Sequence, residues 1–190
     1  RSPCHAKWTA VERKIYLKGS LDMTDTLINL TPPLSGLEEL ARLLLARGET
    51  LGAAESCTGG LISTLITSLP GSSGWFKGGV VSYANEIKSS LLGVPGELLA
   101  ARGAVSEACA LAMAAGAIKA LGAEHSLAVT GIAGPGGGTA TKPVGTVWLA
   151  WSVDGQTTAE HCLFAGNRTE IRTQAAVKAL SGLLDMLKTR

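Results

Sequence analysis

The segment from residue 54 to residue 60 holds the side chains of this chain that are best suited to chemistry, in the order Ala-Glu-Ser-Cys-Thr-Gly-Gly. A short, mostly apolar run at 50–54 is typical of a buried strand, and apolar residues at helical spacing follow from Leu61 to Leu69. Ser56 is therefore predicted to lie in a strand-to-helix turn, where backbone N–H groups and the positive helix end can stabilise an oxyanion or bind phosphate. The pattern indicates a serine nucleophile, and an ordinary Ser or Thr helix cap is the alternative.

Histidine is a poor candidate for the base that such a serine needs. His5 lies in the N-terminal leader, His125 precedes a predicted strand, and His161 lies within the last predicted strand. A Gly-x-Ser-x-Gly elbow is also absent, because the local order is Glu-Ser-Cys-Thr-Gly. If Ser56 is the nucleophile, we expect its base to be another residue type.

Lysine can take the place of histidine, because burial or a nearby cation lowers its pKa and leaves a neutral amine. Lys88 is the candidate, since it follows the exit of a predicted strand that ends at Tyr83. Tyr83 could relay the proton or orient the amine. The alternative is a solvated lysine beside Glu86, with Tyr83 as a half-buried strand aromatic.

Cys57 is a second candidate nucleophile, ranked below Ser56, because a thiol at a helix N-terminus can have a lowered pKa. The other cysteines, Cys4, Cys109 and Cys162, are widely spaced and form no Cys-x-x-Cys pair. All four are expected to be reduced thiols in a cytoplasmic protein. No cluster of His, Cys, Asp or Glu has the spacing of metal ligands, so we expect metal-independent chemistry.

A glycine-dense segment at 131–138 follows another predicted strand. Its bare N–H groups could cradle an anion, although it matches neither the P-loop nor the dinucleotide-binding fingerprint. Lys142 and Arg168 lie beside glycine-containing turns and could contact a phosphate or a carboxylate. Arg168 and Arg172 would share one side of the last helix. Turn-forming glycines and surface charges are the alternatives.

Strands and helices are predicted to alternate along the chain. Strands are expected at 50–54, 79–83 and 126–130, and as a hairpin at 144–153 and 157–164. Helices are expected at 37–45, 61–69, 87–92, 95–101, 106–120 and 167–188. This order predicts an α/β fold, a three-layer α/β/α sandwich with a mixed, mostly parallel sheet of about five strands. We expect one domain at 35–190 after an N-terminal extension or leader at 1–34. Its first residues, 1–18, are either an extension that precedes a natural start at Met23 or the remnant of a linker.

The composition argues against several classes of partner. With 46% hydrophobic residues, 17% charged residues and 24 glycines among 190 residues, the chain resembles a compact α/β protein. A formal net charge of +2, without a basic stripe, argues against nucleic acid. No apolar run is long enough to cross a membrane, and residues 1–18 have no signal-peptide core. We expect a cytoplasmic protein without a cofactor.

Five motifs occur in order along the chain, AESCTGG at 54–60, GVVSYANEIK at 79–88, GAVS at 103–106, TGIAGPGG at 130–137 and KPVGTV at 142–147. Together they resemble the CinA C-terminal domain family, and the similarity extends over about residues 36 to 188. Within that family the stand-alone domain is nicotinamide-nucleotide amidase, which converts nicotinamide mononucleotide to nicotinate mononucleotide and ammonia. The resemblance implies a hydrolase of this kind, acting on a small molecule in pyridine nucleotide recycling.

The resemblance also implies roles for single residues, with Ser56 as the nucleophile, Lys88 as the general base and Tyr83 as an assistant. The expected substrate contacts lie in the glycine-containing loops and at the start of the last helix: Thr58, Gly59, Gly60, Thr130, Gly131, Gly134, Gly136 and Arg168. A catalytically idle domain that binds a nucleotide or a partner in competence or DNA-damage responses is the alternative. We expect a homo-oligomer, for which the small-residue helix at 106–120 could supply an interface as well as a core.

Overall fold

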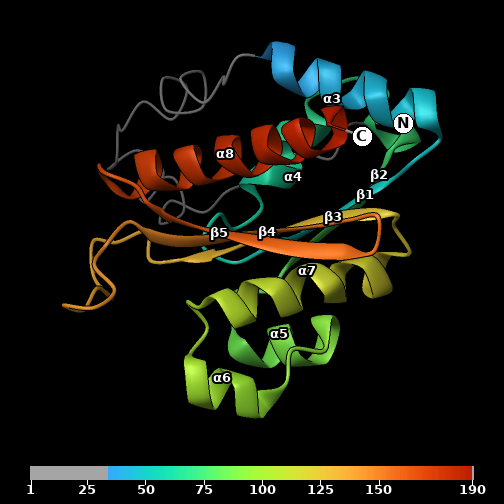
Figure 1. Ribbon diagram of the computed structural model, residues 1–190. Helices are drawn as coiled ribbons and strands as arrows, with labels where there is room; N and C mark the ends of the chain where they lie inside the picture. The colour runs from blue at the N-terminus through green and yellow to red at the C-terminus, as the bar shows by residue number, and fades with distance from the viewer. Residues whose placement is uncertain (1–33, 190) are drawn as a thin grey trace, which may run out of the picture. The chain divides into compact units, whose positions relative to one another are not determined.

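The structure, a computed structural model, describes residues 34–189. Within this range strands are interleaved with helices in the first part of the chain, and the last three strands then follow one another before the last helix (Figure 1). The strands are β1 (Leu51–Glu55), β2 (Phe76–Val81), β3 (His125–Gly131), β4 (Thr146–Val153) and β5 (Gln156–Leu163). The helices are α3 (Leu34–Arg47), α4 (Leu61–Thr67), the 3₁₀ turn η1 (Ser72–Gly74), α5 (Asn85–Leu92), α6 (Gly96–Arg102), α7 (Glu107–Leu121) and α8 (Arg168–Lys188).

The five strands form one mixed sheet in the order β2-β1-β3-β4-β5. β1 runs parallel to both β2 and β3, whereas β4 runs antiparallel to both β3 and β5. Glu55 pairs with Val81 of β2 and with Val129 of β3, so the three parallel strands end close together. The chain passes from β1 to β2 on one side and then to β3 on the other. Such a switch point, at the carboxyl ends of parallel strands, is where open α/β sheets bind ligands.

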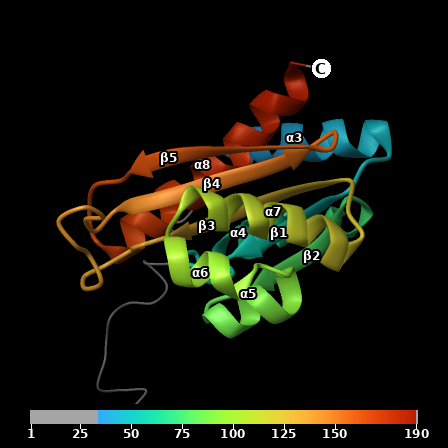
Figure 2. The same cartoon turned by 60° about the horizontal axis from the view of Figure 1, so that its bottom comes forward.

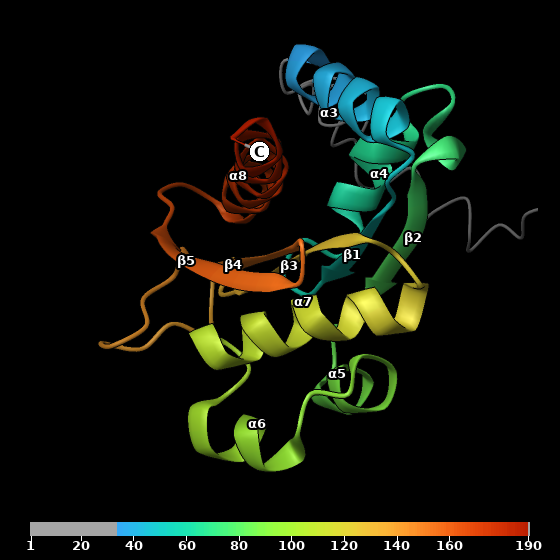
Figure 3. The same ribbon diagram turned by 45° about the vertical axis from the view of Figure 1, so that its right-hand side comes forward.

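Helices cover both faces of the sheet (Figure 3). α3, α4 and α8 lie on one face, and α7 covers the other. α5 and α6 pack on the outer side of α7, as the view of this face in Figure 2 shows. The predicted three-layer α/β/α sandwich with a mixed, mostly parallel sheet is confirmed, with α5 and α6 outside the sandwich proper.

Helix α7 is rich in small residues, and these allow close packing on both of its sides. Ala110, Ala114 and Ala117 are fully buried. A Cβ at Gly116 would collide with the backbone carbonyl of Leu92, so only glycine lets the end of α5 lie this close to α7. The small residues therefore serve the core, and they hold α5 near the edge of the sheet.

Strand β2 begins and ends earlier than the predicted strand at 79–83. Glycine within it is a packing requirement, because a Cβ at Gly79 would clash with the hydroxyl of Ser63 on α4. After the strand, the N–H of Ser82 donates to the carbonyl of Glu55 at 2.7 Å. Tyr83 consequently lies beyond the strand, in the connection to α5.

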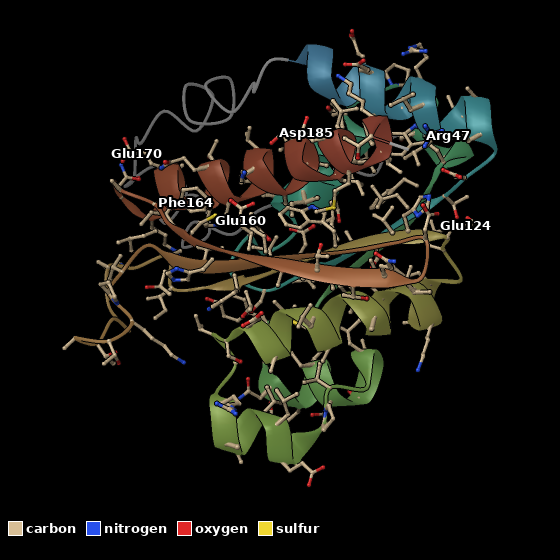
Figure 4. The ribbon with its side chains drawn as sticks, in the orientation of Figure 1. Arg47, Glu124, Glu160, Phe164, Glu170 and Asp185 are labelled. Carbon is tan, nitrogen blue, oxygen red and sulfur yellow. The ribbon has the colours of Figure 1, made fainter. Side chains whose placement is uncertain are left out.

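Helix α8 begins after Asn167, as predicted. The side chain of Asn167 accepts hydrogen bonds from the N–H groups of Thr169 and Glu170, and the Glu170 carboxylate accepts the N–H of Asn167 at 2.6 Å. Glu170 lies at the start of α8 (Figure 4). This capping box stabilises the first turn of α8, which carries Arg168.

The leader predicted at 1–34 lies outside the described residues, apart from Leu34. In the described range, 34–189, no helix has both the length and the apolar character needed to span a membrane.

Candidate active site

A cavity of about 220 Å³ lies at the carboxyl ends of β1 and β3. It is bordered by the start of α5, the start of α8 and the connection between α6 and α7. The predicted site residues that line it are Ser56, Tyr83, Lys88, Thr130, Gly131 and Arg168. The fold thus brings together side chains from distant parts of the sequence at the switch point of the sheet.

Ser56 and Lys88 form a buried, hydrogen-bonded pair at this cavity. Lys88 Nζ lies 3.0 Å from Ser56 Oγ, and it also donates to the carbonyl oxygens of Ser82 at 2.7 Å and Tyr83 at 3.3 Å. Ser56 is 8% exposed and Lys88 is 1% exposed. A neutral amine has two N–H donors and one lone pair. With the two carbonyls taking the donors, the lone pair is left for the serine proton.

Burial lowers the pKa of Lys88 from its ordinary value of 10.5, because the charged ammonium loses its hydration. The thiols of Cys109 and Cys57 act in the opposite direction. Burial raises the pKa of both thiols, so neither carries a negative charge near neutral pH that would retain the proton on Lys88. A solvated lysine beside Glu86, the alternative interpretation of the sequence, does not describe this residue.

Tyr83 contributes its main-chain carbonyl to the lysine, not its phenol. Its side chain is 62% exposed, and its hydroxyl accepts a hydrogen bond from Arg168 Nη2 at 3.2 Å. Among the described residues the phenol makes no hydrogen bond with Lys88. The expectation of a half-buried strand aromatic is wrong, because the chain leaves β2 before Tyr83.

A buried carboxylate occupies the N-terminus of α4. Glu55 is fully buried, and its oxygens accept the N–H groups of Gly60 at 3.0 Å, Ile62 at 3.1 Å and Ser63 at 2.8 Å, together with the Ser63 hydroxyl at 2.7 Å. The expectation that this helix end receives an oxyanion or a phosphate therefore needs correction, because the chain's own carboxylate already takes these donors. Ser56 is not the helix cap either, since Gly60 holds that position.

Two backbone N–H groups beside Ser56, those of Cys57 and Thr58, donate to no other residue within residues 34–189. The N–H of Ser56 itself donates to the carbonyl of Val129 at 2.9 Å. Oxyanion holes are built from backbone donors next to the nucleophile. The N–H groups of Cys57 and Thr58 are therefore the candidates for this function.

Cys57 does not have the lowered pKa expected of a competing nucleophile. Burial raises the pKa of its thiol from 9.0 to about 12, and the charges of Arg172 and Lys88 offset only part of this effect. At neutral pH the thiol is protonated, and a thiol is a much weaker nucleophile than a thiolate.

The described histidines lie away from the cavity. His125 begins β3, at the end of that strand opposite to Thr130, and its Nε2 lies 2.9 Å from Glu49 Oε2. The ring of His161 packs against Trp148, with ring centroids 5.0 Å apart. Within residues 34–189 there is also no group of three His, Cys, Asp or Glu residues arranged to hold a metal ion.

Arg168 reaches the cavity from the first turn of α8. Its Nη1 donates to the carbonyl of Gly134 at 2.8 Å, and its Nη2 donates to the hydroxyl of Tyr83. These bonds join the glycine loop to the segment after β2. The guanidinium is exposed and has further N–H donors, as a contact for an anionic ligand group requires.

Comparison with known proteins identifies the family. A model of the CinA C-terminal domain matches residues 35–187. The chain belongs to the CinA C-terminal domain family. The resemblance of the five sequence motifs is thereby confirmed.

Some relatives of this CinA domain are about as long as the domain itself, and others are much longer. Nicotinamide-nucleotide amidohydrolase PncC of Escherichia coli K12 is 46% identical over 147 residues, which are 77% of this chain and 89% of that protein. A CinA-like protein of Gemmatimonas aurantiaca is 51% identical over 152 residues, which are 78% of this chain and 36% of that protein. The chain thus spans about a third of the length of the CinA-like relatives that it matches.

Solved structures of CinA proteins share the fold. A competence damage-inducible protein of Klebsiella pneumoniae is similar with a TM-score of 0.78 and 40% identity, over 81% of this chain and 96% of that chain. Competence/damage inducible protein CihA of Agrobacterium tumefaciens has a TM-score of 0.74 and 43% identity, over 80% of this chain and 96% of that chain.

One wall of the cavity in this CinA domain is held by two side chains that donate to main-chain carbonyl groups between residues 102 and 105. Thr130 Oγ1 donates to the carbonyl of Ala104 at 2.8 Å, and Lys142 Nζ donates to that of Val105 at 2.7 Å and that of Arg102 at 3.3 Å. Lys142, expected as a possible phosphate contact, does not line the cavity. It ties the glycine loop to the connection between α6 and α7.

Some of the predicted substrate contacts do not line the cavity, and some of the residues that line it were not predicted. The predicted substrate contacts that do not line it, within the part of the chain described, are Thr58, Gly59, Gly60, Gly134 and Gly136. Thr58 is fully buried, and Gly134 contributes a carbonyl to Arg168. The lining residues that we did not predict are Asn85, Ala104, Val105 and Ala133. All four lie inside the five motifs, but alanine and valine carry no chemical signal that would single them out.

Proposed function

We propose that this domain is a nicotinamide-nucleotide amidase, which hydrolyses the carboxamide of nicotinamide mononucleotide to nicotinate mononucleotide and ammonia. The observation that carries the proposal is the buried pair of Ser56 Oγ and Lys88 Nζ, 3.0 Å apart at the switch point of the sheet. The name of PncC, of which this chain covers 89%, supports the choice of substrate. An idle binding domain has no need for a buried lysine that faces a serine.

In this proposal Ser56 and Lys88 act as a serine amidohydrolase pair. Ser56 Oγ attacks the carboxamide carbon while its proton passes to Lys88 Nζ, and the N–H groups of Cys57 and Thr58 bind the oxyanion. Lys88 returns the proton to the leaving nitrogen, and ammonia departs from the tetrahedral intermediate. Water then attacks the acyl-enzyme, with Lys88 accepting its proton, and the carboxylate product is released as Ser56 is protonated again.

The nucleotide part of the substrate lies at Arg168 in this proposal. The exposed guanidinium pairs with the phosphate, and Tyr83 and Gly134 hold the guanidinium in place. Gly131, which lines the cavity, lets β3 lie close to β4, because a Cβ there would collide with the carbonyl of Thr146 at 2.7 Å.

Ammonia release from nicotinamide mononucleotide is the test of the proposal. We expect the purified chain to release ammonia and nicotinate mononucleotide in 1:1 ratio, at the same rate after treatment with a metal chelator. Absence of release from this substrate would contradict the proposal. A chelator-sensitive rate would contradict the metal-independent mechanism while leaving the substrate intact.

Cys57→Ala is expected to retain turnover. With a pKa of about 12 for this thiol, only about one molecule in 10⁵ carries the thiolate at pH 7. We expect kcat/KM within about threefold of the parent, as for a small volume change near a site. Steady-state ammonia release measures this, and a loss comparable to that in a nucleophile variant would show that Cys57 takes part in the chemistry.

Lys142→Met is expected to raise KM about tenfold with a smaller change in kcat, since it removes the charged donor that holds Val105 in the cavity wall. Lys119→Met, which removes an exposed lysine from α7, is the matched control. Initial-rate kinetics over a range of substrate concentrations measure kcat and KM separately. Unchanged KM in the Lys142 variant would show that the wall does not depend on this lysine.

A cytoplasmic location and self-association also remain predictions. Sedimentation of the purified chain tests the second of these.

A further inference from the structure

Two arginines on one side of α8 bind different parts of the site. Arg168 contacts the glycine loop and the Tyr83 hydroxyl, at the cavity. Arg172, one turn further along, donates from Nε at 3.2 Å and from Nη2 at 2.6 Å to the carbonyl oxygen of Thr58. Arg172 therefore holds the turn that carries the nucleophile.

The peptide between Thr58 and Gly59 is held at both of its polar atoms. Its oxygen accepts the two donors of Arg172 and, at the longer distance of 3.3 Å, the N–H of Leu61, and its N–H donates to the carbonyl of Ser56 at 3.1 Å. Gly59 has a φ of 59°, and a Cβ at that position would lie 3.6 Å from Arg172 Nη2. That distance is an ordinary van der Waals contact, so the positive φ, which side chains rarely adopt, is the reason for glycine at this position.

Few other side chains form hydrogen bonds with this turn. Gly59 and Gly60 have no side chains, and the Thr58 hydroxyl makes no hydrogen bond within residues 34–189. Glu55 binds the N–H of Gly60 and of residues in α4. Arg172 is consequently the described side chain that holds the segment between the nucleophile and Gly60, where the two unpaired N–H groups lie.

We propose that Arg172 is a positioning residue of the reaction, which orients the Ser56 to Gly59 turn so that the N–H groups of Cys57 and Thr58 form the oxyanion hole. The inference rests on the proposed serine mechanism and adds a residue to it. Its positive charge also reaches the turn, since it opposes the burial that raises the pKa of Cys57. The same charge favours a negative oxygen at this place.

Arg172→Met should lower kcat about 10²-fold with KM within about threefold of the parent, because a misplaced oxyanion hole weakens transition-state binding more than ground-state binding. Arg168→Met should have the opposite effect on the two kinetic constants, with a raised KM and a smaller change in kcat. Arg42→Met, at a side chain that is 69% exposed on α3, is the control for removal of an arginine. A kcat within threefold of the parent in Arg172→Met would overturn the inference.

Chemical rescue separates positioning from general loss of structure. In Arg172→Ala, added guanidinium should restore kcat at least about tenfold, because the small cation can donate again to the Thr58 carbonyl. Methylammonium, which lacks the planar pair of donors, should restore less. Loss of kcat without rescue, together with a lowered unfolding temperature, would show that Arg172 has only a structural role and would overturn the inference.

A fluorophosphonate probe tests the turn without relying on the proposed substrate. In this reaction Ser56 Oγ forms a bond to phosphorus, the P–F bond breaks, fluoride leaves, and the serine proton passes to Lys88 Nζ. Labelling should be about 10²-fold slower in Arg172→Met than in the parent and unchanged in Arg42→Met. A parent that is labelled but releases no ammonia contradicts the substrate, whereas equal labelling of the parent and Arg172→Met contradicts the role of Arg172.

Discussion

Ser56→Ala is expected to lower the rate of ammonia release at least about 10⁴-fold, because in the proposed mechanism the acyl-enzyme forms on Ser56 Oγ. Cys57 is the nearest competitor, and its protonated thiol cannot take over near neutral pH. Binding and folding should change little, since the substitution removes one oxygen from a turn that Glu55 and Arg172 still hold. The measurement is kcat for nicotinamide mononucleotide, with the dissociation constant of the substrate determined by calorimetry.

Ser181→Ala is the matched control for this substitution. Ser181 lies on α8, where its hydroxyl donates to the carbonyl of Lys178 at 3.2 Å, outside the cavity. Its turnover should equal that of the parent. Full activity in Ser56→Ala would refute the serine mechanism, and the substrate would then have to be hydrolysed by direct attack of water.

Lys88→Met lowers kcat by about 10²–10⁴-fold, the range expected when a general base is lost. Methionine roughly fills the space of the buried stem but cannot accept the proton of Ser56. Lys88→Arg should be similarly inactive, because a guanidinium keeps its proton at any accessible pH. Lys119→Met again serves as the control. Circular dichroism shows whether the loss of the bonds to Ser82 and Tyr83 has unfolded α5.

The pH dependence of kcat/KM provides a second test of Lys88. The base works only as the neutral amine, so activity is present above the pKa of Lys88 and falls as the pH drops through it. Burial lowers this pKa from 10.5, so the acidic limb should lie below that pH and the rate should be level above the limb. The limb should be absent from the residual rate of Lys88→Met. An unchanged profile in that variant would remove Lys88 as the base.

Short-range patterns in the sequence were sufficient to predict the elements of this domain. Ser106 and Asn167 cap α7 and α8 as predicted, and the Asp-Gly pair after Val153 marks the hairpin between β4 and β5. These signals act over a few residues, through capping bonds, turn conformation and hydrophobic periodicity. The edge strand β2 was displaced in the prediction, since glycine weakens a strand signal, whereas Gly79 is required by its contact with Ser63 of α4, which such signals do not report.

The pairing of Ser56 with Lys88 was indicated by the five motifs and not by residue types alone. A lysine beside a glutamate is usually a surface residue, and nothing local distinguishes Lys88 from one. Its proposed function as a base depends on burial, and the close packing of α5 against α7 at Gly116 contributes to that burial. The tertiary structure therefore lowers the pKa of Lys88, as the proposed mechanism requires.

The contacts of Glu55, Arg172 and Lys142 had no counterpart in the sequence prediction. Glu55 binds the start of α4, only five to eight residues along the chain, but it does so through a buried carboxylate that no pattern marked. Arg172 and Lys142 join segments whose meeting depends on the whole sheet, since Arg172 reaches the turn after Ser56 from α8 and Lys142 reaches the α6–α7 connection. Periodicity and turn propensity report the conformation of a segment, because the interactions behind them are local. Which donor meets which acceptor across the sheet depends on how the layers pack, and for this reason the shape and charge of the site could be described only in the folded domain.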